Sequence, residues 1–110
     1  IDAIIETGAD IIQTLPSPPT GDIDFKELSA RHGGKACFNC GVDTVKIRYG
    51  KPDEIDHDVR NVLDIMAPSG KFILGTSDSI TDGSPEENVM AFFTTAREYG
   101  QDIARRLYWN

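Results

Sequence analysis

Hydrophobic and polar residues follow a pattern that occurs three times along the chain. Each repeat has a short apolar run, then a loop rich in turn-forming residues, then a stretch with apolar residues at helical spacing. The apolar runs cover residues 9–15, 36–45 and 71–77. The first run is apolar on both faces, which is typical of a strand covered on both sides. The pattern therefore predicts three strands, each followed by a helix.

The first two helices have clear start signals. Asp22 suits the N-cap of a helix over residues 23–32, because its carboxylate can accept hydrogen bonds from the first free amides. The strongest helical pattern covers residues 49–67, where Pro52 suits the first turn and the apolar residues form one stripe. The loop before the first of these helices contains three prolines, which exclude helix and central strand there.

The third helix is predicted to begin after Ser84. Ser84 and Glu87 have the spacing of a capping box, and Pro85 takes the first helical position. Gly100 is a predicted helix end. Three apolar residues beyond this glycine are expected to pack on the outer shell of the fold or on a partner subunit: Ile103, Leu107 and Trp109.

Strands that alternate with helices predict an α/β fold with a parallel sheet. Three such units are too few to close a barrel, which needs about eight. The sheet would have two bare edges and an uncovered face, which folded proteins generally avoid. The chain also opens with Ile1 rather than Met. We therefore expect residues 1–110 to be a fragment whose missing strands come from an absent part of the protein or from another copy.

Composition and charge exclude several classes of partner for this chain. Of 110 residues, 26% are charged and 39% hydrophobic, as in ordinary globular proteins, and the net charge is −7. This charge argues against nucleic acid and anionic membrane surfaces as partners, because both require clustered Lys and Arg. No apolar run approaches the roughly 20 residues of a membrane span. Two cysteines are too few for a disulfide framework and fit a reducing, cytoplasmic location.

The two cysteines have the C-x-x-C spacing of redox dithiols and of half a zinc site. Cys37 and Cys40 both fall in the second predicted strand, in "KACFNCGVD". Residues three apart on a strand point to opposite faces, so the sulfurs should not meet. Cys37 is expected to pack as a small hydrophobe. Cys40 lies near the carboxyl end of the strand, where parallel-sheet enzymes place their sites.

The order of four motifs resembles the carboxyl-terminal part of the uroporphyrinogen decarboxylase superfamily. That superfamily includes uroporphyrinogen decarboxylase and the zinc-dependent methyltransferases that act with methylated corrinoids. The resemblance covers roughly residues 1–100 and is most specific at the strand–turn–"SPEEN" segment. It implies that the chain supplies the last three βα units of a (β/α)8 barrel, a single domain over residues 1–110 that is incomplete on its own. The motifs are "TGADIIQT", "KACFNCGVDTV", "YGKPDEIDHDVRNVL" and "FILGTSDSITDGSPEENVMAFFTTAREYG".

The resemblance also implies site residues. In "NCGVDTV", Cys40, Gly41 and Asp43 match the Gly, Asn and Asp of a family motif, and with Asn39 they form the expected substrate-binding and catalytic segment. Gly41 departs from the family amide, and Thr44 departs from the family proline.

A further site residue is expected in the third loop. Asp78 falls where the decarboxylases have a His and the methyltransferases have a zinc-binding Cys. An Asp can ligate zinc, but it cannot replace imidazole as a neutral hydrogen-bonding group. Its presence therefore weakens the decarboxylase hypothesis more than the methyl-transfer hypothesis.

Each of these residues also has an alternative, purely structural interpretation. Asp78 is a metal or substrate ligand, or it is a turn residue that bonds its own backbone. Asp43 orients a ligand, or it caps a helix and braces a loop. His32, at the end of a helix, and His57, on the polar side of another, are not expected to be catalytic.

The resemblance implies two hypotheses for function, and the bare sheet edges imply a third. The first is methyl transfer involving a corrinoid, with zinc as a possible cofactor, methylcobalamin as a possible co-substrate and a corrinoid protein as a possible partner. The second is decarboxylation of a tetrapyrrole in porphyrin biosynthesis, which uses no cofactor. The third is a non-catalytic assembly module whose bare edges pair between copies. On the two enzyme hypotheses, the fragment alone is expected to be inactive, because the remaining site residues lie in the missing amino-terminal part of the barrel. A homo-oligomer is also expected.

Overall fold

Three parallel strands run side by side in the order in which they occur in the chain. The structure, a computed structural model, describes residues 1–108. β1 (Ile11–Gln13) pairs with β2 (Cys37–Val42), and β2 pairs with β3 (Phe72–Thr76). The sheet order is β1-β2-β3, and both pairs are parallel. The predicted α/β class and its parallel sheet are confirmed, and each strand is shorter than its apolar run.

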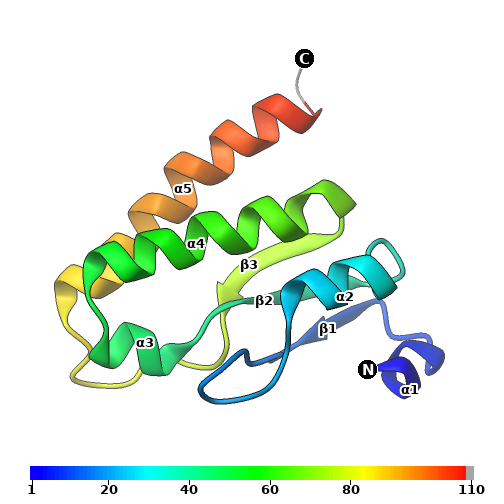
Figure 1. The fold of residues 1–110 in the computed structure, drawn as a ribbon, viewed down its shortest axis with the longest axis horizontal. Coiled ribbons are helices and arrows are strands. Elements are labelled where there is room, and N and C mark those ends of the chain that lie inside the picture. The colour runs from blue at the N-terminus through cyan, green and yellow to red at the C-terminus, as the bar shows by residue number, and fades with distance from the viewer. Residues whose placement is uncertain (109–110) are drawn as a thin grey trace.

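Helices connect the strands and cover the sheet (Figure 1). One long helix follows each strand, so that strands and helices alternate as predicted. α4 packs against both α5 and β2, and α2 packs against α4. Two short helices and a 3-10 turn complete the set. The elements are α1 (Asp2–Glu6), α2 (Phe25–His32), α3 (Thr44–Tyr49), α4 (Pro52–Met66), the 3-10 turn (Ala67–Ser69) and α5 (Glu86–Tyr108).

Burial along the strands shows that helices cover one face of the sheet. Ile12 and Phe38 are register partners, and both are buried in the helix-covered core. On the opposite face, Ile11 is 56% exposed and Ile73 is 46% exposed. We call this opposite face the open face; its strand residues are Ile11, Gln13, Cys37, Asn39, Gly41, Ile73 and Gly75.

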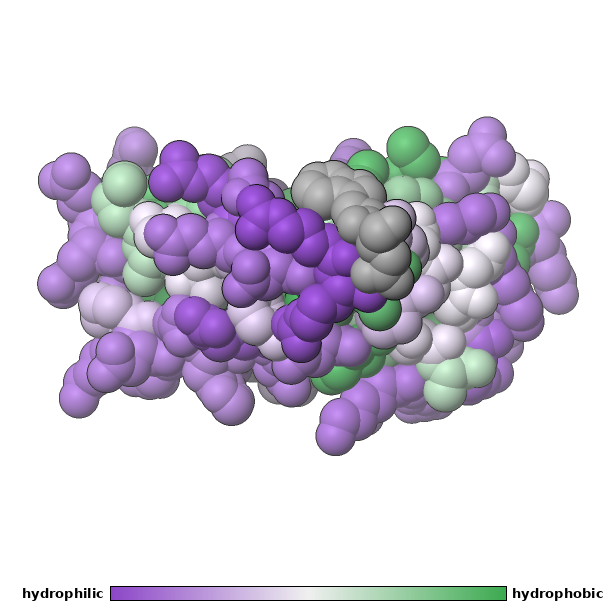
Figure 2. Space-filling view, turned by 90° about the horizontal axis from the view of Figure 1, so that it is seen from above, coloured by the Kyte–Doolittle hydropathy of each residue, from purple (hydrophilic) through white to green (hydrophobic). Residues whose placement is uncertain are grey.

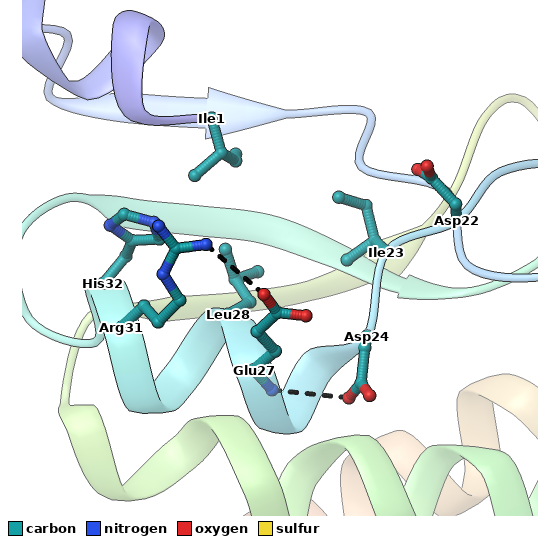
Figure 3. Close-up of a pocket in the computed structure, with 8 residues that line it drawn as sticks. All are labelled: Ile1, Asp22, Ile23, Asp24, Glu27, Leu28, Arg31 and His32. Atoms are coloured by element: carbon teal, nitrogen blue, oxygen red, sulfur yellow. Dashed lines mark hydrogen bonds and ion pairs between the residues drawn. The ribbon is translucent and has the colours of Figure 1, made fainter.

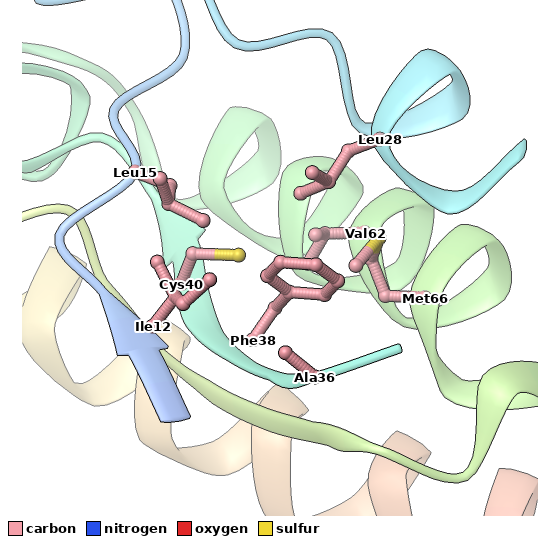
Figure 4. Close-up of a cluster of buried hydrophobic side chains, with 8 residues drawn as sticks. All are labelled: Ile12, Leu15, Leu28, Ala36, Phe38, Cys40, Val62 and Met66. Atoms are coloured by element: carbon pink, nitrogen blue, oxygen red, sulfur yellow. The ribbon is translucent and has the colours of Figure 1, made fainter. Parts of the chain in front are cut away.

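The core lies between the covered face and helices α2 and α4 (Figure 4). Phe38 is fully buried at its centre, and its ring packs among side chains from both helices. A second cluster continues the core between α4 and α5 and includes Val59 and Phe92. The apolar stripe that the sequence predicted over residues 49–67 is confirmed, because its members are buried: Ile55, Val59, Val62, Leu63 and Met66.

Two local predictions are wrong. The N-cap of α2 is Asp24 rather than Asp22, and its Oδ1 accepts hydrogen bonds from the backbone N–H groups of Lys26 (2.9 Å) and Glu27 (3.4 Å). The second strand ends at Val42, and the residues expected to continue it form α3 instead. Asp43 causes this change, because its side chain caps α3 by accepting the N–H of Val45.

The third helix is longer than predicted. Gly100 does not end it, because α5 continues to Tyr108. Ile103, one turn further on, is buried against the core, so tertiary packing outweighs the low helix propensity of glycine. Leu107 is 44% exposed, and Trp109 lies outside the described residues.

The surface of the helical layer is largely hydrophilic (Figure 2). Apolar side chains gather there in separate patches rather than in one continuous area. Within residues 1–108, none of the helices is long and apolar enough to cross a membrane.

Candidate functional site

The carboxyl ends of all three strands meet at one edge of the sheet. This follows from their parallel direction, and it brings the ends of β2 and β3 together, with Val42 and Thr76 as register partners. The two aspartates predicted from the resemblance, Asp43 and Asp78, come directly after this edge. Ligand sites in parallel sheets lie at such edges. We therefore describe this edge and the adjoining open face as the candidate site.

Asp43 is engaged by protein groups on both carboxylate oxygens. Its Oδ1 accepts hydrogen bonds from Thr20 Oγ1 (2.8 Å) and from the N–H of Val45 (2.9 Å), and its Oδ2 accepts from the N–H of Thr20 (2.9 Å). The residue is 1% exposed. These contacts are those of a carboxylate that caps α3 and holds the loop between β1 and α2 against the end of β2.

Asp78 lies on the surface. Its Oδ1 accepts a hydrogen bond from the N–H of Ser79 (2.7 Å), and its backbone carbonyl accepts one from Thr76 Oγ1 (2.6 Å). This is the geometry of a turn aspartate. Its exposed position at the carboxyl edge leaves it accessible to a ligand.

Ser77 is a site residue that the sequence did not reveal. It is buried, and its Oγ accepts a hydrogen bond from the N–H of Thr44 (3.1 Å). This bond ties the end of β3 to the start of α3 and so fixes the two strand ends relative to each other. A serine in a loop rich in Ser, Thr and Asp gives no sequence signal that marks it as buried.

Two glycines form the part of the open face nearest to the carboxyl edge. Gly41 and Gly75 are register partners on adjacent strands. A side chain at position 41 would collide with the carbonyl oxygen of Gly75. A side chain at position 75 would begin 2.9 Å from Asn39 Oδ1, so the Asn39 carboxamide lies against Gly75. The predicted residues Asn39 and Gly41 therefore both lie beside Gly75 of β3.

Cys40 does not join this group. Its side chain lies on the covered face, fully buried beside Phe38 and Leu15 (Figure 4). Burial raises the pKa of the Cys40 thiol to about 12, and the nearby Cys37 adds to the rise. A thiol with this pKa is protonated at neutral pH and is a poor nucleophile and metal ligand.

Cys37 lies on the opposite face and is half-buried, and both cysteines are free. The prediction that the C-x-x-C sulfurs do not meet is confirmed. Cys37, which is expected to pack as a small hydrophobe, is only half-buried. Cys40 is the fully buried cysteine, because the side chains at even positions of β2 point to the helices.

A cavity of about 270 Å³ adjoins the carboxyl edge on its helical side. The loop before α2 and helices α3 and α4 line it, and they bring Ser17 and Asn61 to its wall beside Asp43. Lys46 Nζ lies there 2.9 Å from Asp58 Oδ2, so its charge is already paired. His57 lies outside this cavity, on the exposed side of α4.

A second, smaller cavity of about 130 Å³ lies near α2, away from the carboxyl edge (Figure 3). His32 and Arg31 line one side of it, and Arg31 is paired with Glu27. His32 is buried; its Nε2 lies 2.9 Å from Asp2 Oδ1, without hydrogen-bonding geometry. These contacts hold α1 against α2, as expected for a structural histidine.

The most specific motif of the resemblance has a structural explanation. Asn88 in "SPEEN" is buried, and its Nδ2 donates hydrogen bonds to the carbonyl oxygens of Ile47 (2.9 Å) and Gly50 (2.8 Å). It thereby satisfies carbonyl groups at the end of α3 that the helix leaves free. The motif positions α5 against α3 and does not itself reach the carboxyl edge.

The described residues do not form a metal site by themselves. Across residues 1–108, no three His, Cys, Asp or Glu side chains cluster in a way that can hold a metal ion. Asp78 can contribute one oxygen, whereas protein zinc sites require at least three ligands from the protein.

Comparison with known proteins gives no identification. No protein-family model, no curated protein and no solved structure matches the chain.

Proposed function

We propose that this chain forms three consecutive βα units of a (β/α)8 barrel in an enzyme of the uroporphyrinogen decarboxylase superfamily. The observation that carries the proposal is the sequential strand order β1-β2-β3 with helices on one face. In doubly wound sheets the order reverses at a switch point, and helices cover both faces. A sheet wound in one direction closes into a barrel when more units are added, and its open face becomes the interior.

Further strands would complete the pocket. They come from a segment of the same protein outside these residues or from another chain. The carboxyl edge, with Asp78 exposed and Asn39 on the adjoining open face, would then form part of the barrel mouth.

For the reaction, we propose methyl transfer involving a corrinoid rather than decarboxylation of a tetrapyrrole. A tetrapyrrole with many carboxylates requires a cationic site. The carboxyl edge instead carries Asp43 and Asp78, and nearby Lys46 is paired with Asp58. A neutral or cationic substrate suits this edge better, because it avoids repulsion between like charges.

Zinc does not enter the proposed steps. The described residues supply one candidate ligand, Asp78, and do not fit a zinc site alone. We therefore assign Asp78 the role of an accessible carboxylate at the barrel mouth, where it can orient the methyl acceptor.

The test is an assay of the full-length protein for transfer of the methyl group from methylcobalamin to a thiol. The absorbance change of the corrinoid measures the rate. Asp78→Ala should lower kcat/KM at least tenfold, and Asp82→Ala, a change at an exposed aspartate in the same loop, should leave it unchanged. Zinc content of both variants shows whether Asp78 is also a ligand. A metal-free protein that decarboxylates a tetrapyrrole and transfers no methyl group would overturn the proposal.

The apolar open face favours one second candidate, a non-catalytic assembly module. Ile11 and Ile73 are exposed large apolar side chains on the two edge strands of the sheet, and such surfaces commonly bind protein partners. On this hypothesis, copies of the chain associate through their open faces. Size-exclusion chromatography with light scattering tests it, and a well-folded monomer at high concentration would exclude it.

A further inference from the structure

Two carboxamide side chains are neighbours on the open face. Gln13 of β1 and Asn39 of β2 are partners in the register of the two parallel strands. The side chains of register partners point to the same face of the sheet, and here no helix covers that face. Gln13 is exposed and Asn39 is half-buried. Within residues 1–108, neither side chain makes a hydrogen bond.

The surroundings of this pair are electrically neutral. The preceding register pair on the open face is Ile11 with Cys37, and the partner of Asn39 on β3 is Ile73. Toward the carboxyl edge come Gly41 and Gly75, which add no side chain and no charge. The open face thus offers hydrogen-bond donors and acceptors without a formal charge.

The Asn39 carboxamide lies beside Gly75. Its Oδ1 is 2.9 Å from the position that a Cβ atom at residue 75 would take. The carboxamide therefore lies toward the carboxyl edge, where the candidate site is.

Unpaired carboxamides are costly once a barrel closes over them. Buried amide groups in folded proteins almost always have hydrogen-bond partners. If the open face becomes a barrel interior, Gln13 and Asn39 require a partner that the described residues do not supply.

We infer that Gln13 and Asn39 together bind a carboxamide group of the ligand in the pocket. This inference rests on the proposed function, in which the ligand is a corrinoid, a macrocycle with carboxamide side chains at its periphery. A carboxamide both donates and accepts hydrogen bonds, so it pairs with Gln and Asn in both directions. A carboxylate only accepts, and on this neutral face its charge would have no counterion.

The experiment is equilibrium dialysis of the full-length protein with methylcobalamin and with a corrinoid whose side-chain amides are hydrolysed to carboxylates. The wild-type protein should bind the amide form about tenfold more tightly than the carboxylate form. Gln13→Ala and Asn39→Ala should each weaken binding of the amide form about tenfold, the effect of losing one or two hydrogen bonds. Cys37→Ala, at the preceding position on the same face, is the matched control and should change binding less than twofold.

The outcomes separate this inference from the proposed function. Unchanged binding in Gln13→Ala and Asn39→Ala, with methyl transfer intact, overturns the inference and leaves the proposed function standing. Absence of both corrinoid binding and methyl transfer in the wild-type protein overturns both. If circular dichroism shows that an alanine variant is unfolded, Gln13→Glu and Asn39→Asp replace it. These keep the side-chain shape but remove the donor, so they should show the same loss of affinity.

Discussion

At the scale of single residues, the site aspartates have different roles. Asp43 is buried and accepts three hydrogen bonds, whereas Asp78 is exposed and accepts one from the adjacent residue. Both aspartates follow a predicted strand, so the sequence pattern did not show that one is buried and the other exposed. The difference comes from Thr20, which reaches Asp43 from 23 residues away. A contact of this kind depends on the tertiary fold and is not visible in a local motif.

The bracing role of Asp43 predicts a large loss of stability on its removal. Asp43→Ala leaves the groups of Thr20 and Val45 without their acceptor, and it should lower the free energy of unfolding by about 2–4 kcal/mol. Asp78→Ala is the control and should cost less than about 0.5 kcal/mol. Urea unfolding followed by circular dichroism measures both. Equal effects of the two changes would contradict the assigned roles.

Burial of Cys40 predicts a loss of stability at alkaline pH. The thiol has a pKa of about 12 in the folded chain and near 8.5 when unfolded. Above the unfolded pKa the unfolded state binds fewer protons than the folded state, so stability falls as pH rises, by up to about 1.4 kcal/mol per pH unit, until the folded pKa is reached. Urea unfolding between pH 7 and 10 should show this extra slope.

The matched variant for this measurement is Cys40→Ala, which should lack the extra slope. The difference between the two proteins isolates the thiol from Lys and Tyr residues that titrate in the same range. Parallel pH curves for the wild-type protein and the variant would show that the folded thiol ionises as readily as the unfolded one.

At the scale of elements, α5 shows how packing overrides local signals. The sequence correctly predicted its start near Pro85 but placed its end at Gly100, because glycine is common after helices. The structure continues the helix to Tyr108, since Ile103 packs against α4.

Gly100 is therefore a point where stability can be gained. Its Cβ position is open: apart from its chain neighbours and the backbone of α5 itself, no atom lies within 4 Å. Gly100→Ala should stabilise the chain by about 0.5–1 kcal/mol, because alanine loses less backbone entropy in a helix. Thermal unfolding measures the change, and Gly34→Ala is the comparison. Gly34 has a φ of +82°, which alanine adopts only with strain, so this substitution should lower the stability of the chain. A lower melting temperature for Gly100→Ala would indicate that α5 ends earlier.

The sequence predicted the three strands, their parallel direction and the helices after them, because each has a long periodic pattern. It missed α3, whose β-branched residues Thr44 and Val45 resemble a continued strand. It also missed Ser77 and Gln13, which gain their meaning from strand register. Register depends on which strands are neighbours, and a single segment does not contain that information.

At the scale of the whole molecule, the two faces of the sheet differ. One face is packed against helices, and the other carries exposed apolar and neutral polar residues. This asymmetry follows from connections that all pass on one side, as right-handed crossovers do when strand order is sequential.

The asymmetry predicts that the loss of apolar side-chain atoms costs different amounts of stability on the two sides of the sheet. Ile73→Thr on the open face should lower the stability of the 110-residue chain by less than about 1 kcal/mol, because Ile73 is already half-exposed. Val62→Ala on the covered side should cost about 2 kcal/mol or more, because Val62 is buried. In the full-length protein the cost of Ile73→Thr should rise if further strands cover it. An unchanged cost there would contradict closure of a barrel.

The glycine pair on β2 and β3 has an evolutionary consequence, because its two members are restricted by different kinds of atoms. At position 41 the obstacle is backbone, the Gly75 carbonyl oxygen, so no change of a neighbouring side chain removes it. At position 75 the obstacle is the end of the Asn39 side chain, which a mutation can shorten. Position 41 is thus fixed as long as these two strands stay paired, whereas position 75 can drift together with position 39. Related chains with a larger residue at 75 would have moved or lost the carboxamide at 39, and with it the ligand contact inferred above.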